Sequence, residues 1–116
     1  MWLNNEPDFF SAYLRDVTTG EYVGEACWFY DAVAQAHVAG VLVEAGRRGR
    51  GYCAPALRAL LARAFARGDI GVMRCDISSD NAPALRGYAR AGFHAFGERD
   101  GQVTMLYTRE DWERTI

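Results

Sequence analysis

Apolar residues in the first part of the chain cluster as they do in β-strands. Residues 9–17 and 22–30 are rich in aromatic and β-branched side chains, and the polar stretch 18–21 between them is typical of a turn. These segments therefore predict a β-hairpin. After a connecting loop over 31–35, residues 36–44 are almost continuously apolar, as expected of a strand that is covered on both faces.

The spacing of apolar residues changes to a helical period over residues 52–67. Pro55 is tolerated in the first turn of such a helix, where its missing N–H has no intrahelical partner, and Gly68 is a suitable C-cap. The apolar positions that share one face are Leu57, Leu60, Leu61, Ala64 and Phe65. This pattern predicts an amphipathic helix that packs on a sheet.

The second half of the chain alternates again between the two periods. The expected elements are a strand over 70–78, a helix over 81–90 stopped by Gly92, a hairpin of 93–98 and 102–108 around an Asp-Gly turn, and a frayed turn over 110–116. The order β-β-β-α-β-α-β-β predicts an α/β fold with a mixed sheet (α+β), in which one strand–helix–strand crossover lies between hairpins.

Composition limits the class of protein. The 116 residues suffice for one domain, 1–116, and half of them are hydrophobic, which allows a core. The net charge of -2 argues against non-specific binding to nucleic acid or to a membrane surface. All 13 basic residues are arginine, which suits phosphate recognition, although genome bias is the commoner reason for such a composition.

The cysteines and the first residues indicate a reducing, cytoplasmic location. Cys27, Cys53 and Cys75 are widely spaced, and their odd number argues against a disulfide framework. They form no CxxC pair, and no metal is expected. The first seven residues lack the basic and apolar regions of a signal peptide, and no apolar run approaches the roughly 20 residues of a membrane span.

An arginine-rich turn broken by glycines joins the third predicted strand to the first helix. Such a turn points backbone N–H groups at one place, at the positive end of a helix dipole, which suits a pyrophosphate. No Gly-Lys-Ser/Thr follows, so the turn is not a Walker A loop, and it lacks the glycine pattern of a Rossmann fingerprint. The residues of this turn are Arg47, Arg48, Gly49, Arg50, Gly51, Tyr52, Cys53 and Ala54.

Together with Val41-Leu42-Val43 before it, this turn resembles the acetyl-CoA motif of the GNAT N-acetyltransferase superfamily. A second block is similar to the later motif of that family: Asn81, Ala84, Leu85, Tyr88, Arg90, Ala91, Gly92 and Phe93. The resemblance covers roughly residues 9–108 and implies the acyl-CoA N-acyltransferase fold. The small residues after Gly51-Tyr52 resemble most the branch that acetylates the N-termini of ribosomal proteins.

The resemblance implies roles for several of the matching residues. Backbone N–H groups of residues 48–54 would hold the pyrophosphate of acetyl-CoA, and Val41–Val43 would pair with its pantetheine arm where two central strands separate. Asn81 resembles the residue that hydrogen-bonds this arm. Tyr88 resembles the phenol that protonates the leaving thiolate.

Two positions depart from the family pattern. Cys53 stands where the family prefers Gly or Ala; a helix N-terminus can acidify such a thiol, although a buried, inert cysteine is the commoner case. The family's catalytic Glu is replaced by Val38. His37 and Glu44 are the nearest alternatives, and His37 is the candidate base, with an ordinary surface histidine as the other interpretation.

The chain resembles a member of the family that begins at the second strand, without the helices that form one wall of the acceptor cleft. An exposed edge strand over 9–17 and nearby aromatic residues then favour self-association as a homodimer, although ordinary core packing accounts for most of these aromatic residues. Those aromatic residues are Trp2, Phe9, Phe10, Trp28 and Phe29.

Two functions follow from the resemblance. The first is an N-acetyltransferase that moves an acetyl group from acetyl-CoA to a primary amine, on a protein N-terminus or a small molecule, by direct transfer in a ternary complex. The alternative is a non-catalytic module that binds CoA or acyl-CoA, or completes a partner.

Overall fold

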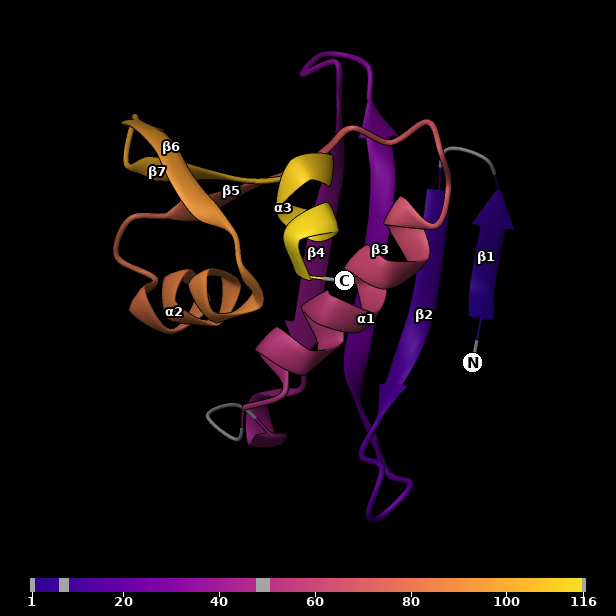
Figure 1. Cartoon of the computed structure of the whole chain (residues 1–116). Helices are drawn as coiled ribbons and strands as arrows, with labels where there is room; N and C mark the ends of the chain where they lie inside the picture. Colours follow the sequence, from indigo (N-terminus) through magenta and orange to yellow (C-terminus); the bar gives the residue numbers. More distant parts are fainter. Residues whose placement is uncertain (1, 7–8, 48–50, 116) are drawn as a thin grey trace.

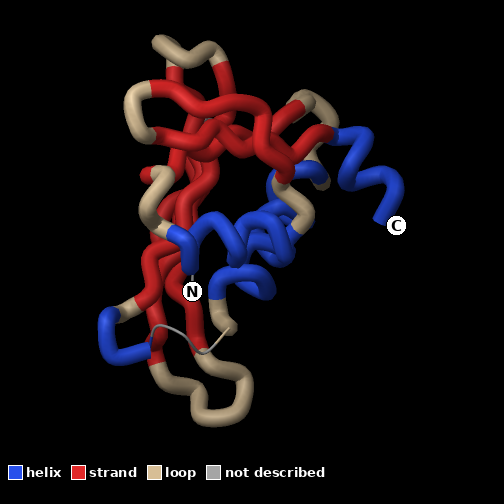
Figure 2. The backbone as a smooth tube through the Cα atoms, turned by 90° about the vertical axis from the view of Figure 1, so that its left-hand side faces the viewer, coloured by secondary structure: helices blue, strands red, loops and turns tan. Residues whose placement is uncertain are grey.

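The computed structural model describes residues 2–6, 9–47 and 51–115, which form a mixed sheet with the helices gathered on one side (Figures 1 and 2). The described strands are β1 (Trp2–Glu6), β2 (Phe9–Arg15), β3 (Tyr22–Asp31), β4 (Ala36–Val43), β5 (Val72–Ser78), β6 (His94–Arg99) and β7 (Gln102–Thr108). The described helices are α1 (Cys53–Phe65), α2 (Ala82–Ala91) and α3 (Arg109–Thr115), with a short 3-10 turn η1 (Ala45–Arg47) before α1. This is the mixed α/β architecture that the sequence predicts.

Strand order places the one parallel pair of the described sheet at its centre. The order is β1-β2-β3-β4-β5-β7-β6, and β4 and β5 are the parallel neighbours that α1 connects. These two strands pair only where His37 faces Met73 and Val38 faces Arg74. Beyond Val38 they separate, so the sheet opens between the rest of β4 and β5.

The core lies between the sheet and α1. Alternate residues of neighbouring strands face the helix, as in the register pairs Phe10–Trp28 and Trp28–Ala39, and all three are buried. The rings of Phe10 and Trp28 stack with centroids 5.9 Å apart. The apolar face predicted for α1 is confirmed, because the residues that it buries include Leu57, Leu60, Leu61, Ala64 and Phe65.

The beginning of the sheet differs from expectation. Residues Trp2–Glu6 form β1, which pairs antiparallel with β2 from Glu6↔Phe9 to Trp2↔Ala12. The prediction that residues 9–17 form an edge strand is therefore wrong, since β2 lies between β1 and β3. Five residues with one strongly apolar pair carry too little periodicity to be recognised as a strand alone.

The end of α1 and the C-terminal segment also differ from what the sequence predicts. The C-cap of α1 is Ala66 in the right-handed region, not Gly68. Instead of a left-handed glycine, the guanidinium of Arg109 satisfies the terminal carbonyls, donating to Phe65 and Arg67. The frayed turn predicted for 110–116 is wrong as well, because residues 109–115 form α3.

Local capping explains why α3 forms. The Thr108 N–H donates to Asp111 Oδ2 at 2.9 Å, and the Asp111 N–H donates to Thr108 Oγ1 at 3.1 Å, a reciprocal capping box. Trp112 then stacks on Phe65 of α1 with ring centroids 6.1 Å apart.

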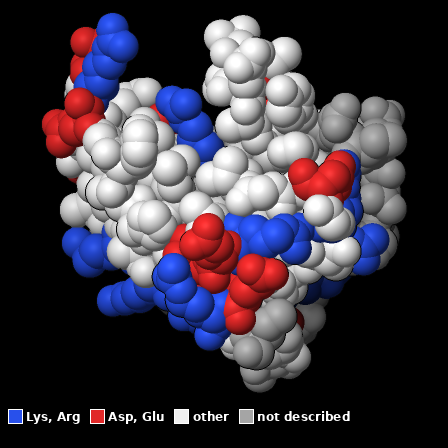
Figure 3. Space-filling model, turned by 45° about the horizontal axis from the view of Figure 1, so that its top comes forward, with Lys and Arg blue, Asp and Glu red and all other residues white. Residues whose placement is uncertain are grey.

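No helix in the described part of the chain is long and apolar enough to cross a membrane. On the face shown in Figure 3, acidic and basic side chains are interspersed.

Candidate functional site

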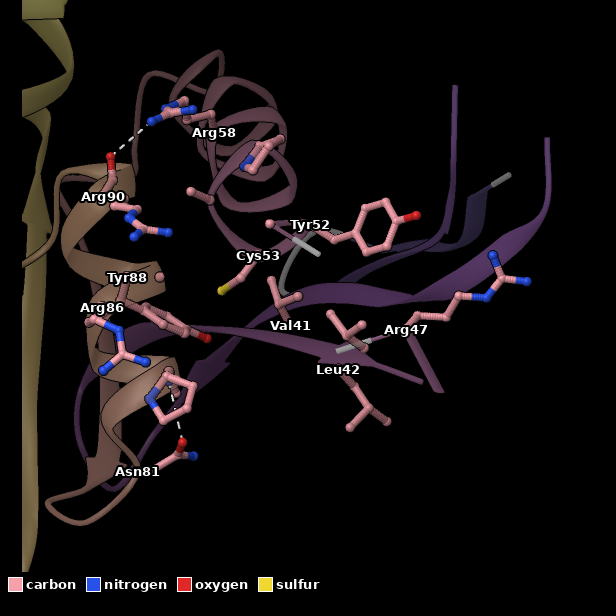
Figure 4. A pocket seen from close by; sticks show the side chains of 17 residues that line it. Val41, Leu42, Arg47, Tyr52, Cys53, Arg58, Asn81, Arg86, Tyr88 and Arg90 are labelled. Carbon is pink, nitrogen blue, oxygen red and sulfur yellow. Dashed lines mark hydrogen bonds between the residues drawn. The ribbon is translucent and has the colours of Figure 1, made fainter. Parts of the chain in front are cut away.

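A pocket of about 890 Å³ opens between β4, the start of α1 and α2 (Figure 4). Its lining brings together most of the residues that the sequence singles out. The described lining residues are Val41, Leu42, Val43, Arg47, Gly51, Tyr52, Cys53, Ala54, Pro55, Arg58, Asn81, Pro83, Ala84, Arg86, Gly87, Tyr88 and Arg90. Arg48, Gly49 and Arg50 lie outside the described residues.

The separation of β4 from β5 gives this pocket a wall of backbone groups. The N–H of Glu44 donates to the carbonyl of Val23 on β3 at 2.8 Å. Because backbone groups alternate in direction along a strand, those of Val41 and Val43 face away from β3, toward the gap where β5 has diverged. These are the groups that an extended ligand can pair with.

The Tyr88 side chain is buried, 5% exposed, and its hydroxyl lies at the same gap. The Cys75 thiol and the backbone of Val41 lie close enough to influence its pKa. Burial raises the pKa of Tyr88 strongly, the neighbouring Cys75 raises it further, and the Val41 backbone acts weakly in the other direction. The phenol is therefore protonated throughout the neutral range.

Both ends of α2 are fixed, which places Tyr88. Asn81 is the N-cap: its Oδ1 accepts from the Ala84 N–H at 3.3 Å, so its Nδ2 remains as the donor toward the pocket (Figure 4). Gly92 ends the helix in the left-handed region, with φ of 111°. The stop predicted at Gly92 is thus confirmed.

Gly87 sets how closely α1 and α2 approach beside the pocket. A Cβ at this position would lie 2.8 Å from Cys53 Sγ and 3.0 Å from Cys53 Cβ, which is closer than side chains tolerate. The sequence motifs do not single out Gly87, although a glycine inside a helix is a signal of close packing. Burial raises the pKa of the Cys53 thiol, so the acidified thiol considered from sequence is not found.

Residues on each side of the undescribed segment 48–50 are tied to the turn between β2 and β3. The Tyr52 hydroxyl donates to Asp16 Oδ2 at 2.7 Å, and Arg47 pairs with Glu21. The hydrogen bond from Tyr52 is the main cause that lowers the pKa of Asp16, so this carboxylate is ionised at neutral pH. Gly51 has φ of 79°, a conformation that favours glycine.

The start of α1 has no acidic side chain in its first turn and no side-chain cap at Tyr52. Its terminal N–H groups and its dipole therefore favour an anionic ligand. The pocket has the matching charge, since its described lining includes four arginines and no Asp or Glu. Of these, Arg58 and Arg86 were not identified from the sequence, and Arg90 appeared there only as part of the second motif block, without a role.

The base predicted from the sequence, His37, does not belong to the described pocket. His37 is absent from the described lining of the pocket, and its ring packs edge-on against Trp28 and Tyr30, with centroids 5.7 and 5.2 Å away. No group of three or more potential metal ligands occurs among the residues that the structure describes.

Comparison with known proteins identifies this arrangement. The model of the acetyltransferase (GNAT) family matches residues 1–93. Among solved structures, the chain is similar to the aminoglycoside acetyltransferase AAC(6')-Ib in complex with coenzyme A, with a TM-score of 0.77 and 24% identity over 93% of this chain and 70% of that one. It is also similar to the spermidine N-acetyltransferase of Vibrio cholerae in complex with CoA and spermine, with a TM-score of 0.76 and 12% identity over 92% and 69% of the two chains. At these identities the structural likeness shows a common fold.

Proposed function

The chain belongs to the GNAT acetyltransferase family, and from that premise we propose that it transfers an acetyl group from acetyl-CoA to a primary amine within a ternary complex. The observation that carries the proposal is the position of the Tyr88 hydroxyl, beside Val41 where β4 and β5 separate.

The cofactor occupies the pocket along its length. Its pyrophosphate lies on the N–H groups around Gly51–Ala54, where no acidic side chain competes for them. Arg48, Gly49 and Arg50 remain predicted contributors. The pantetheine arm pairs with the backbone of Val41–Val43 and accepts a hydrogen bond from Asn81 Nδ2. The thioester then reaches the Tyr88 hydroxyl.

Tyr88 acts as the general acid. The amine nitrogen attacks the thioester carbonyl carbon, the C–S bond breaks, and the Tyr88 hydroxyl donates its proton to the departing sulfur. The acetylated nitrogen then loses its extra proton to solvent, and the Tyr88 oxygen takes a proton back from solvent before the next turnover. The raised pKa of Tyr88 means that the phenol still holds its proton at neutral pH when the substrates bind. An amine that arrives neutral needs no protein base before attack, which fits a pocket whose described lining does not include His37.

The proposal also includes the acceptor, the cellular location and the oligomeric state. The acceptor is a protein N-terminus, as in the ribosomal-protein branch, or a small amine of the kind named for the neighbours, an aminoglycoside or a polyamine. The protein acts in the cytoplasm. It forms a homodimer through the side of the sheet away from α1, where Phe9 and Phe29 are each 37% exposed and lie opposite each other in register.

The test is CoA release from acetyl-CoA with a panel of polyamines, aminoglycosides and peptides with free N-termini. Turnover is expected with at least one class. Tyr88→Phe is expected to lower kcat by about 10²- to 10⁴-fold while calorimetric affinity for CoA stays unchanged. Tyr13→Phe, the same change outside the described pocket, is expected to leave both values unchanged.

Two results would contradict the assignment. Normal turnover in Tyr88→Phe would remove its role as the acid. Tight CoA binding without turnover on any amine class would instead favour the non-catalytic CoA-binding module.

A further inference from the structure

Three arginines of the pocket have no acidic partner among the residues that the structure describes. Among the described residues, no ion pair includes Arg58, Arg86 or Arg90, whereas Arg47, the fourth arginine of the lining, is paired with Glu21. Arg58 instead donates to the backbone carbonyl of Arg90 at 2.9 Å. This wall of the pocket therefore has positive charge that nothing in the described structure compensates.

The three side chains lie along one side of the pocket although they come from two helices. Arg86 and Arg90 are four residues apart on α2, hence on one face, where like charges repel each other. Arg58 of α1 bridges to the end of α2, and in Figure 4 the three guanidinium groups lie along the α2 side of the pocket. A shared anion would relieve this repulsion.

This group is separate from the pyrophosphate position at the start of α1. Arg58 follows Cys53 by five residues, which corresponds to about 7.5 Å along a helix axis. Two anion positions in one continuous pocket fit a ligand that carries two separate phosphate groups.

We propose that Arg58, Arg86 and Arg90 bind a phosphomonoester, the 3′-phosphate of the coenzyme, and thereby select CoA over 3′-dephospho-CoA. This inference rests on the proposed function, since it takes the pyrophosphate to lie at the start of α1. A doubly charged phosphate with three equivalent oxygens matches several guanidinium forks, whereas a phosphodiester or a single carboxylate carries one negative charge and would leave more of the positive charge uncompensated.

The experiment measures the affinity of the full chain for CoA and for 3′-dephospho-CoA by calorimetry. The parent protein is expected to bind CoA about 10- to 100-fold more tightly, as expected for charge-assisted hydrogen bonds to one phosphate. In the triple variant R58Q/R86Q/R90Q, CoA affinity is expected to fall to that of 3′-dephospho-CoA, and affinity for 3′-dephospho-CoA to stay within about 3-fold.

Matched measurements separate this role from a structural one. Arg99→Gln, at an arginine whose side chain is 93% exposed near the β6–β7 turn, is expected to leave the ratio of the two affinities unchanged. Without ligand, R86Q is expected to unfold at the same temperature as the parent or higher, because it removes a like-charge pair.

Each outcome decides the proposal. Equal affinity of the parent protein for both nucleotides would show ordinary solvated arginines and overturn the phosphomonoester site, while the cofactor assignment would stand. A ratio that persists in the triple variant would also overturn it. Failure of the parent protein to bind either nucleotide would overturn both this proposal and the cofactor site.

Discussion

Replacing Arg109 by alanine would remove the side chain that closes the carboxyl end of α1. Its Nε donates to the carbonyl of Ile70 at 3.0 Å, and its Nη2 donates to the carbonyls of Phe65 and Arg67. The guanidinium also lies over the Phe65 ring, 5.3 Å from its centroid. Arg109 therefore replaces the glycine cap that α1 lacks.

The magnitude follows from these contacts. Hydrogen bonds from a charged donor contribute about 1.5–3 kcal/mol each, and the cation–π contact about 0.5–1 kcal/mol. Because Arg109 is only half-buried, water can replace some of the hydrogen bonds to these carbonyls in the variant. We therefore expect Arg109→Ala to lower the free energy of unfolding by about 2–4 kcal/mol. Arg109→Lys keeps the charge but cannot reach three carbonyls at once, and it is expected to lose an intermediate amount.

Urea denaturation measures this loss. Arg114→Ala, on the same helix, is the control: its side chain is 72% exposed and pairs only with Glu110 and Asp111 in the described structure, so a loss below about 0.5 kcal/mol is expected. If Arg109→Ala lost less than about 1 kcal/mol, its role as the cap of α1 would be refuted.

Three further predictions concern the contact between α1 and α2, the buried thiols and the capping box of α3. Gly87→Val is expected to destabilise the fold by about 1–3 kcal/mol, because its side chain would overlap Cys53, and Gly97→Val, in open space on β6, serves as the control in the same urea experiment. Burial raises the pKa of Cys53 and raises that of Cys75 to about 11, so iodoacetamide is expected to label both slowly near neutral pH until the protein is unfolded; rapid native labelling would contradict this. Burial alone would raise the pKa of Asp111, but hydrogen bonds from Thr108 and His94 outweigh this effect and leave the pKa below the usual 3.8. The ionised Asp111 therefore stabilises the fold above the usual pKa, and this stabilisation is lost as the pH falls through the pKa of the folded state. Asp111→Asn is therefore expected to flatten the acid limb of stability against pH, and an unchanged limb would count against the capping box.

The sequence predicts the central elements well because their periodicity is long. The run over 36–44 and the apolar face of α1 both correspond to observed elements, and the separation of β4 from β5 that the family resemblance implies is present. Tyr88 and Asn81 reach one pocket because both lie on α2, seven residues apart.

Features that depend on distant contacts were not predicted. A left-handed glycine at position 68 is not used because Arg109, more than 40 residues later, satisfies the same carbonyls. β1 is defined by its pairing with β2 rather than by its own pattern. In the sequence, Arg58 on α1 and Arg86 and Arg90 on α2 look like ordinary solvated residues of two separate helices. Only the packing of α1 against α2 brings them to the same side of the pocket.

The central claim is that the turn before α1 holds the pyrophosphate of acetyl-CoA, and a pair of matched glycine substitutions tests it most directly. Gly51 and Gly101 have nearly the same left-handed φ, 79° and 76°, and a Cβ at either would meet no atom of the described residues within 4 Å. Gly51→Glu and Gly101→Glu therefore introduce equal backbone strain and equal charge, one at the pocket and one at the β6–β7 turn. Calorimetric titration with acetyl-CoA is expected to show about micromolar affinity in the parent protein and in Gly101→Glu, and at least about 100-fold weaker binding in Gly51→Glu. Equal affinity in the two variants would contradict the claim.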